Sequence, residues 1–293
     1  MSLPVFKAAS LATRLVPLNQ LCDLAELLGR HAGPRLMPEK TAQLARHIQR
    51  VKPGITQDEA TTAAAAGIGS YARYWVEMFR LPTLTAKTVG DGFTVDGFGH
   101  IEAAIAGGHG PILALPHLGS WEWAAAWLNH CNGLEVAAVA ERLEPEELFD
   151  WFIDLRASYG IEIIPLGTSA VGRLTAAVRE LKVVCLLADR DIGGNGVEVS
   201  FFGEKTTLPA GPALVARRTG APLHPTAVYF DGRSRHAVIA DAIRPDTDAK
   251  LRPDVARVTQ ELATALEKLI ERAPDQWHLL QPNWPSDAKG ARW

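Results

Sequence analysis

A histidine follows a short apolar run that is typical of a buried strand. The run Ile112–Leu115 is followed by Pro-His-Leu-Gly-Ser-Trp-Glu, in which four residues separate His117 from Glu122. Ser120 is a plausible N-cap, so Glu122 falls in the first helical turn, where the helix dipole favours an ionised carboxylate. A carboxylate beside an imidazole fixes its tautomer and stabilises the cation formed on protonation. The segment therefore indicates acid–base chemistry. The structural alternative is a core histidine beside a capping glutamate.

Charged residues follow other predicted strands. The carboxyl ends of parallel strands meet at one edge of an open α/β sheet, and ligands bind at that edge. Buried charges are costly unless they are paired or face a cleft. These residues therefore predict a polar site around His117, although a solvated or salt-bridged loop uses the same residue types. They are Glu141 and Arg142 after one strand, Asp189, Arg190 and Asp191 after another, and Arg156 on the helix before a third.

Asp189 and Asp191 also resemble the D-x-D pair that holds a divalent cation in many glycosyltransferases. Two carboxylates in one loop can share Mg²⁺ or Mn²⁺. The intervening Arg190 and the lack of a nucleotide-sugar signature weigh against this interpretation. A metal-dependent glycosyltransferase is the alternative enzyme, and a non-catalytic lipid-binding protein is the alternative from another class.

Composition and missing motifs exclude several functions. The 293 residues contain no GxGxxG, P-loop, HExxH or GxSxG motif, which disfavours dinucleotide, phosphate-loop, zincin and serine-hydrolase chemistry. A net charge of -3 gives no indication of a nucleic-acid partner, and three widely spaced cysteines make neither a CxxC site nor a disulfide framework. No apolar run approaches the roughly 18 to 20 residues of a membrane-spanning helix.

The first part of the chain is predicted to be helical. Leucines recur at steps of three and four between Leu11 and Leu28, with Pro17 expected to kink or split that helix. A second helix is expected near Glu39 to Val51, and a third starts at a Thr56–Glu59 capping box and ends before Pro82. Residues 1–55 carry eight Lys and Arg against three acidic residues. This basic, amphipathic section is expected either to face an anionic membrane or to pack on the core.

From about residue 93, apolar runs alternate with helical segments. This alternation predicts an α/β fold in which helices flank both faces of a central sheet. We expect one domain, with a helical, membrane-facing section at 1–82 and an α/β catalytic core at 93–293. The predicted strands are Ile112–Leu115, Val136–Val139, Ile161–Ile164, Val183–Leu187, a strand at Val197–Phe201, and Pro225–Tyr229; the predicted helices are 121–130, 145–159, 170–181, 210–219 and 253–271.

The H-x4-E segment matches the motif of the glycerolipid and lipid A acyltransferase superfamily. Further blocks follow in an order and spacing that resemble the lipid A biosynthesis acyltransferases, from about residue 70 to Trp284, and together they are specific. The resemblance implies a mixed central sheet with helices on both faces. The blocks are Ala140-Glu-Arg-Leu143, the segment around Arg156, Ala188-Asp-Arg-Asp191, Gly196–Gly203 and Leu208-Pro-Ala-Gly-Pro212.

Within that family the chain looks like the phosphatidylinositol mannoside acyltransferase branch. The likeness lies in four segments: Ala140-Glu-Arg-Leu143, Phe201-Phe-Gly-Glu204, Leu208–Ala213 and Trp277-His-Leu-Leu-Gln-Pro282. The resemblance implies transfer of a palmitoyl group from palmitoyl-CoA to a mannose hydroxyl of a mannosylated phosphatidylinositol, with acyl-CoA as substrate and no cofactor or metal. It also implies a peripheral protein at the cytoplasmic face of the cell membrane. Lipid A-type acylation is the alternative within the family.

The resemblance also assigns site residues. His117 is expected to act as general base on the acceptor hydroxyl, with no acyl-enzyme. Relatives more often carry glutamate where this chain has the shorter Asp189, so the acidic partner of His117 stays open between Glu122 and Asp189. The family analogy places Arg156, Asn195 and Arg218 near the CoA path. The other residues expected to bind substrate are Ser120, Glu141, Arg142, Arg190 and Asp191.

Two further features are expected around the base. Backbone amides at the start of the 121–130 helix are candidate donors to the oxyanion of a tetrahedral intermediate. An acyl groove is expected along Trp121, Phe201, Phe202 and the small residues near Pro209–Ala213, although aromatic residues at strand spacing also suit an ordinary core.

Overall fold

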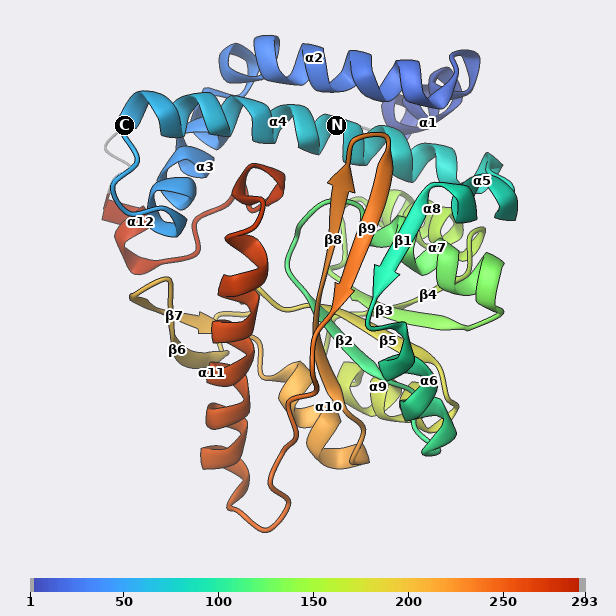
Figure 1. Cartoon of the computed structure of the whole chain (residues 1–293), viewed down its shortest axis with the longest axis vertical. Helices are drawn as coiled ribbons and strands as arrows, with labels where there is room; N and C mark the ends of the chain where they lie inside the picture. The colour runs from blue at the N-terminus through green and yellow to red at the C-terminus, as the bar shows by residue number, and fades with distance from the viewer. Residues whose placement is uncertain (1–2, 290–293) are drawn as a thin grey trace.

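The strands form one mixed sheet and one separate hairpin in a computed structural model that describes residues 3–289 (Figure 1). The seven-stranded sheet contains, in spatial order, β1 (Phe93–Asp96), β9 (Ser234–Ile239), β8 (Leu223–Asp231), β2 (Ile112–Leu115), β5 (Val183–Leu187), β3 (Val136–Ala140) and β4 (Ile161–Pro165). The hairpin joins β6 (Val197–Phe201) to β7 (Glu204–Leu208). Strands β8, β2, β5, β3 and β4 are mutually parallel, whereas β9 runs antiparallel to β8 and parallel to β1. The predicted mixed α/β class is confirmed.

The helices begin and end at the residues that the local sequence favours. Pro17 separates the first two helices, as predicted, and lies at the N-cap of the second. The Thr56–Glu59 capping box is present at the start of the fourth. The helices are α1 (Leu3–Ala12), α2 (Leu18–Leu36), α3 (Pro38–Val51), α4 (Gln57–Arg80), α5 (Ala86–Asp91), α6 (Phe98–Ala106), α7 (Trp121–Asn132), α8 (Glu146–Ala157), α9 (Ala170–Arg179), α10 (Gly211–Thr219), α11 (Leu251–Ile270) and α12 (Pro285–Lys289), with 3₁₀ turns at Thr13–Leu15, Leu81–Thr83 and Pro274–Gln276.

Three strands lay outside the sequence prediction. β1 lies at the edge of the sheet with β9 beside it, and β7 belongs to the separate hairpin. In β9 buried residues alternate with partly buried ones. β9 contains Arg235 and His236, so it lacks the continuous apolar run by which the central strands were predicted.

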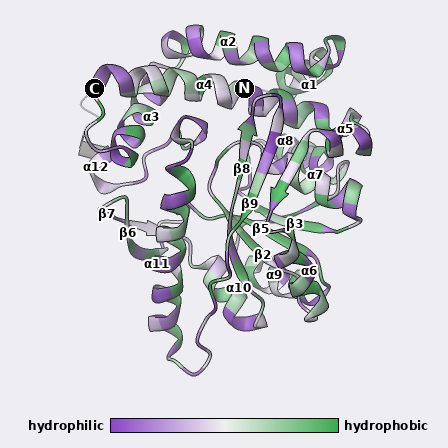
Figure 2. Ribbon diagram, in the orientation of Figure 1, coloured by the Kyte–Doolittle hydropathy of each residue, from purple (hydrophilic) through white to green (hydrophobic). Residues whose placement is uncertain are grey.

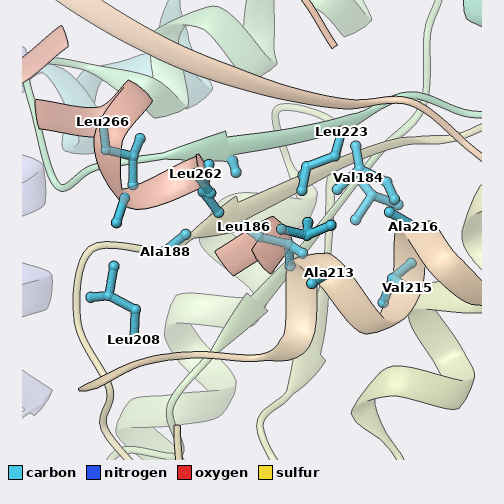
Figure 3. Packing of buried hydrophobic residues seen from close by; sticks show 14 of the residues in the cluster. Val184, Leu186, Ala188, Leu208, Ala213, Val215, Ala216, Leu223, Leu262 and Leu266 are labelled. Atoms are coloured by element: carbon cyan, nitrogen blue, oxygen red, sulfur yellow. The ribbon is translucent and has the colours of Figure 1, made fainter. Parts of the chain in front are cut away.

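Two apolar clusters cover the two faces of the sheet. On one face Val184 and Leu186 of β5 pack against α10 and α11, as Figure 3 shows. On the other face α4, α7 and α8 contribute residues such as Trp123 and Phe152. The hydropathy colouring in Figure 2 accordingly runs hydrophobic through the central strands. A parallel sheet covered in this way holds its strand ends rigidly, which allows loops at the strand ends to position side chains.

Helix α4 crosses the edge of the sheet at which the parallel strands end. Figure 1 shows α4 and then α2 stacked at the end of the molecule toward which β8 points. Arg73 of α4 donates a hydrogen bond of 2.8 Å to the carbonyl of Gly232, in the turn that follows β8. Tyr74, the next residue, reaches the start of α7. The N-terminal helices are therefore fixed above the edge where the sequence placed the polar site.

Several leucines of the predicted apolar stripe of α2 are exposed, and small residues of α2 contact α4 instead. A Cβ on Gly29 would lie 2.7 Å from the Cα of Gly69, so a small-residue face of α2 packs against α4. Leu24, Leu27 and Leu28 point outward, with exposed fractions of 46%, 55% and 56%. The spacing identified a helix correctly, but several leucines lie on its unburied face. Within residues 3–289 no helix combines the length and the apolar character needed to cross a bilayer.

A buried ion network attaches α4 to the sheet. Glu77 is fully buried and accepts hydrogen bonds from Arg73, at 2.7 Å, and from Arg235 of β9. The guanidinium of Arg235 also lies 3.7 Å from the ring centroid of Trp123 on α7. Removing one partner of a buried pair leaves an uncompensated charge.

We therefore expect Glu77→Ala to lower the free energy of unfolding by about 3–5 kcal/mol, because two buried guanidinium groups lose their acceptor. Denaturant unfolding measures this change. Glu102→Ala, on the exposed side of α6, is the control and is expected to stay within about 0.5 kcal/mol of the native protein. Equal effects of the two substitutions would contradict the role given to the Glu77 network.

Candidate active site

The loop between β2 and α7 holds His117 at the carboxyl edge of the sheet. Two residues later the backbone passes so close to β8 that a Cβ on Gly119 would lie 1.8 Å from the carbonyl oxygen of Val228. Gly119 also has a φ of +59°, which favours glycine. Only glycine fits this turn, which presents His117 on one side and the start of α7 on the other.

Asp189 is the acidic group that contacts His117. It follows β5, the neighbour of β2, and its Oδ1 accepts a hydrogen bond of 2.6 Å from Nδ1 of His117. Its Oδ2 accepts one of 2.9 Å from the backbone N–H of the same residue. The carboxylate is fully buried, whereas the imidazole is 34% exposed. Nδ1 is thereby occupied, and Nε2 has no hydrogen-bond partner among the described residues.

The pair shifts the protonation equilibria of both groups. Burial disfavours the charged imidazole, but the charge and the hydrogen bond of Asp189 outweigh burial, so the pKa of His117 is raised. Burial likewise opposes ionisation of Asp189, but the interaction with His117 and the hydrogen bond from Trp277 outweigh it and lower the pKa of that carboxyl. Burial, with the nearby charge of His117, lowers the pKa of His278 to about 3, so this neighbouring ring stays neutral. The site therefore joins an ionised Asp189 to a partly exposed base.

The chain's C-terminal region supplies contacts to which the sequence analysis assigned no role. The indole N–H of Trp277 donates to Oδ2 of Asp189 at 2.7 Å, and the side-chain amide of Asn283 donates to the Asp189 carbonyl at 3.0 Å. The backbone N–H of His278 donates to the carbonyl of His117. The only sequence signal for this region was the family-like block that begins at Trp277, because about ninety residues separate it from Asp189.

Glu122 lies in a separate buried cluster. Its Oε1 accepts hydrogen bonds from the hydroxyl of Tyr74, at 2.8 Å, and from Arg156, at 3.1 Å, while Oε2 has no partner among the described residues. Burial raises the pKa of Glu122 despite the opposing charge of Arg156. The sequence analysis expected the helix dipole to favour the ionised form, but burial has the larger effect. The two candidates left open for His117 are thus separated: Asp189 contacts the imidazole, and Glu122 joins α4, α7 and α8.

Arg190 and Asp191, which follow Asp189 in the chain, have different surroundings. Arg190 is partly buried, and its charge opposes protonation of His117. Asp191 accepts hydrogen bonds from the backbone N–H groups of Gly194, at 3.1 Å, and Gly196, at 2.7 Å, and so shapes the loop that carries the exposed Asn195.

The other predicted site residues are more dispersed. Glu141 and Arg142 are exposed in the loop that follows β3, and the Arg142 guanidinium lies 5.9 Å from the ring centroid of Phe149. Ser120 occupies the N-cap of α7 and is buried, but its side chain makes no capping hydrogen bond.

Arg156 and Arg218 do not gather around His117 in the predicted way. The Arg156 side chain is mostly buried and paired with Glu122, so it is not free to meet a phosphate in this arrangement. Arg218 lies at the end of α10, shortly before Leu223, which pairs with the first residue of β2. His117 follows the last residue of β2. Arg218 is therefore placed at the opposite edge of the sheet from His117.

The D-x-D interpretation does not fit the observed contacts. Both carboxylate oxygens of Asp189 accept hydrogen bonds from His117 and Trp277, and both of Asp191 accept them from backbone amides. Among residues 3–289 no three His, Cys, Asp or Glu side chains are grouped so that they could hold a metal ion. The two aspartates thus act in different contacts rather than as one ligand pair.

An apolar cavity lies between the sheet and helices α6 and α7. Its volume is about 20 Å³, and Leu115 and Trp121, which flank the His117 loop in sequence, line it together with Phe98, Trp127 and Val228. Of the residues expected to line an acyl groove, only Trp121 lines this cavity.

The aromatic residues of the expected groove divide between the two faces of the sheet. Trp121 lines the cavity, whereas Phe201 and Phe202 belong to the cluster on the opposite face. Phe201 stacks on Trp284 there, with ring centroids 5.6 Å apart.

Comparisons with known proteins identify the family of the chain. A family model described as bacterial lipid A biosynthesis acyltransferase matches residues 5–286. The phosphatidylinositol mannoside acyltransferase of Mycobacterium tuberculosis (strain ATCC 25618 / H37Rv) is 38% identical over 296 residues, which cover 98% of this chain and 90% of the relative. The protein of the same name from Mycolicibacterium smegmatis (strain ATCC 700084 / mc(2)155) is 36% identical over 271 residues, or 92% of this chain and 85% of the relative. These similarities confirm the resemblance that the motifs indicated. The chain belongs to the bacterial lipid A biosynthesis acyltransferase family and is an acyltransferase.

Proposed function

We propose that this enzyme transfers a palmitoyl group from palmitoyl-CoA to a mannose hydroxyl of a mannosylated phosphatidylinositol, with His117 as general base. The observation that carries the proposal is the pair formed by Asp189 and Nδ1 of a partly exposed imidazole whose Nε2 is unoccupied. The choice of acceptor follows the two relatives described above, both of which are named phosphatidylinositol mannoside acyltransferase. Lipid A precursors are the alternative acceptors to test.

The reaction requires one proton relay. Nε2 of His117 takes the hydroxyl proton as the sugar oxygen bonds to the thioester carbon, and an oxyanion forms. The C–S bond then breaks, and the imidazolium returns the proton to the CoA thiolate. Asp189 stabilises the imidazolium between these steps and keeps its own charge, in agreement with its lowered pKa. A thioester is already activated, so no acyl-enzyme is required, and the proposal includes no cofactor or metal.

Backbone amides at the start of α7 are available to the oxyanion. The N–H of Gly119 is already bonded to the carbonyl of Gln276 at 3.0 Å. The N–H groups of Ser120 and Trp121 donate to no other group of the described chain. They lie a few residues from His117, at the positive end of the α7 dipole, and preorganised donors of this kind contribute about 3–4 kcal/mol each to the transition state.

The apolar cavity beside α7 is the proposed entrance for the acyl chain. Leu115 and Trp121 line it, so it begins next to the loop that carries the base. Its volume of about 20 Å³ is roughly that of one water molecule, so a long acyl chain enters only if lining side chains move apart. Burial of methylene groups compensates for that rearrangement at about 0.8 kcal/mol each.

The outer face of α1 and α2 is the proposed membrane contact. The exposed leucines of α1, of α2 and of the 3₁₀ turn between them are Leu11, Leu15, Leu24, Leu27, Leu28 and Leu36. The basic residues Lys7, Arg14, Arg30 and Arg35 are also exposed. The acidic residues of α2 are instead paired, Asp23 with the exposed Arg233 and Glu26 with the buried Arg73. Leucines surrounded by unpaired positive charge suit an anionic bilayer at the cytoplasmic face of the cell membrane, where acyl-CoA is present.

Replacing the base tests the mechanism directly. We expect His117→Ala to lower palmitoyl transfer at least about a hundredfold, since a general base contributes about 10²–10⁴ in rate. CoA release is measured with mannosylated and lipid A-type acceptors, and circular dichroism checks the fold. EDTA is expected to have no effect. Full activity of His117→Ala would disprove the base, and turnover of a lipid A precursor alone would disprove the acceptor.

The pH profile tests the acidic partner. The base acts when neutral, so activity falls as the pH drops through the raised pKa of His117. Asp189→Asn removes the charge that raises this pKa, so the acid limb of kcat/KM is expected to move to lower pH, while the rate at the optimum falls because the amide no longer fixes the tautomer. An unmoved acid limb would contradict the pair.

Vesicle binding tests the proposed membrane face. Leu24→Glu combined with Leu28→Glu is expected to weaken co-sedimentation with phosphatidylglycerol vesicles by tenfold or more, because it removes apolar contact and adds repulsion. The control is Leu251→Glu, an exposed leucine at the start of α11. Native protein is expected to dissociate as salt is raised and to bind phosphatidylcholine vesicles poorly. Equal binding of both variants would exclude this face.

A further inference from the structure

The segment 276–284 lies against the catalytic loop through several backbone contacts. The N–H of His278 donates to the carbonyl of His117, and the carbonyl of Gln276 accepts from the N–H of Gly119. Between these contacts, Leu118 and Trp277 form an isolated antiparallel bridge. The segment therefore fixes the backbone on both sides of Leu118 and places the Trp277 indole next to Asp189.

We propose that Trp277 is a positioning residue, whose indole N–H holds Oδ2 of Asp189 so that Oδ1 stays directed at Nδ1 of His117. This inference rests on the proposed role of His117 as base. The hydrogen bond is 2.7 Å long, and both side chains are fully buried. Trp277 touches no reacting atom in this scheme and acts through Asp189.

Two donors on one oxygen determine how the carboxylate is rotated. A carboxylate turns about its Cβ–Cγ bond, and that torsion is broad. Oδ2 receives the backbone N–H of His117 at 2.9 Å and the indole N–H at 2.7 Å, from different directions. With both donors present, only Oδ1 is left for the imidazole. Without the indole, the backbone N–H of His117 is the one remaining donor to Oδ2 among the described residues, and the carboxylate is free to rotate away from Nδ1.

Trp277 is itself held by aromatic packing. Its ring centroid lies 5.5 Å from that of His47, 5.9 Å from Phe202 and 6.3 Å from Trp284. Nδ1 of His47 lies 2.9 Å from the carbonyl oxygen of Leu279, which ties the same segment to α3. The indole therefore has little freedom to turn its N–H away from Asp189.

The indole also affects the chemistry of the pair. The charge and the hydrogen bond of Asp189 raise the pKa of His117, so a carboxylate that is no longer held with Oδ1 at Nδ1 stabilises the imidazolium less, and this pKa falls. The acid limb of the pH profile then moves to lower pH, in the same direction as for Asp189→Asn but by less, because the carboxylate keeps its charge. The other charged or titratable groups around His117 are Arg190, Glu122 and His278, and none of these bonds to Trp277.

The experiment compares Trp277→Phe with Trp284→Phe. Trp284 is a matched control, since it is buried in the same cluster and its indole N–H donates to the carbonyl of Phe201 rather than to Asp189. We expect Trp277→Phe to lower kcat about tenfold to a hundredfold, the loss typical of a hydrogen bond to a charged group. KM for palmitoyl-CoA is expected to stay within about twofold, and the acid limb to move to lower pH. Trp284→Phe is expected to change thermal stability while its acid limb stays unchanged.

Equal kcat values and equal acid limbs for the two variants would overturn the inference. Should Trp277→Phe fail to fold, β-(3-benzothienyl)alanine at position 277 retains the ring size and removes only the N–H, and the same two readouts decide. His117→Ala separates the two proposals. If that variant is inactive while Trp277→Phe behaves like its control, the positioning role alone fails. If His117→Ala is active, the base itself is wrong.

Discussion

The site depends on keeping one buried carboxylate charged. Asp189 is fully buried, and an unpaired charge in that position would be strongly unfavourable. Its two oxygens receive three donors, two from His117 and one from Trp277. These donors come from the loop that follows β2 and from the segment that follows α11, while Asp189 itself follows β5. The contact forms only when all three parts of the chain are in place, so catalytic geometry and correct folding of the sheet edge are coupled.

Helix α4 joins the N-terminal helices to this edge. Its inner residues include Tyr74, which contacts Glu122, and Glu77, which is buried against Arg235 of the sheet. Its outer side receives the small residues of α2. The outward-facing leucines of α2 are therefore held in a fixed position relative to His117 through two closely packed helices.

The sequence predicted the central strands and the position of His117 at the end of β2 because both depend on local pattern. β2 and β5 were predicted at their observed bounds, since parallel strands covered on both faces are continuously apolar. β9 was missed because it carries polar residues at alternating positions. Trp277 received no role, and nothing local marks a tryptophan as the donor to an aspartate that is distant in the chain. Arg218 was placed by analogy and lies at the other edge of the sheet, because a linear motif does not record on which side of the sheet a helix ends.

The H-x4-E motif illustrates why spacing alone left the acidic partner open. Both Glu122 and Asp189 follow strands that end at the same edge, but helix geometry directs Glu122 toward α4 and α8, where Tyr74 and Arg156 bind it. A carboxylate with a raised pKa and a cationic partner is suited to joining helices. Asp189 has a lowered pKa, and its Oδ1 accepts a hydrogen bond from the imidazole, so it is suited to stabilising that imidazole as it gains a proton. The two acids therefore have different tasks because their hydrogen-bond donors differ, and the length of the aspartate side chain is sufficient because β5 lies directly beside β2.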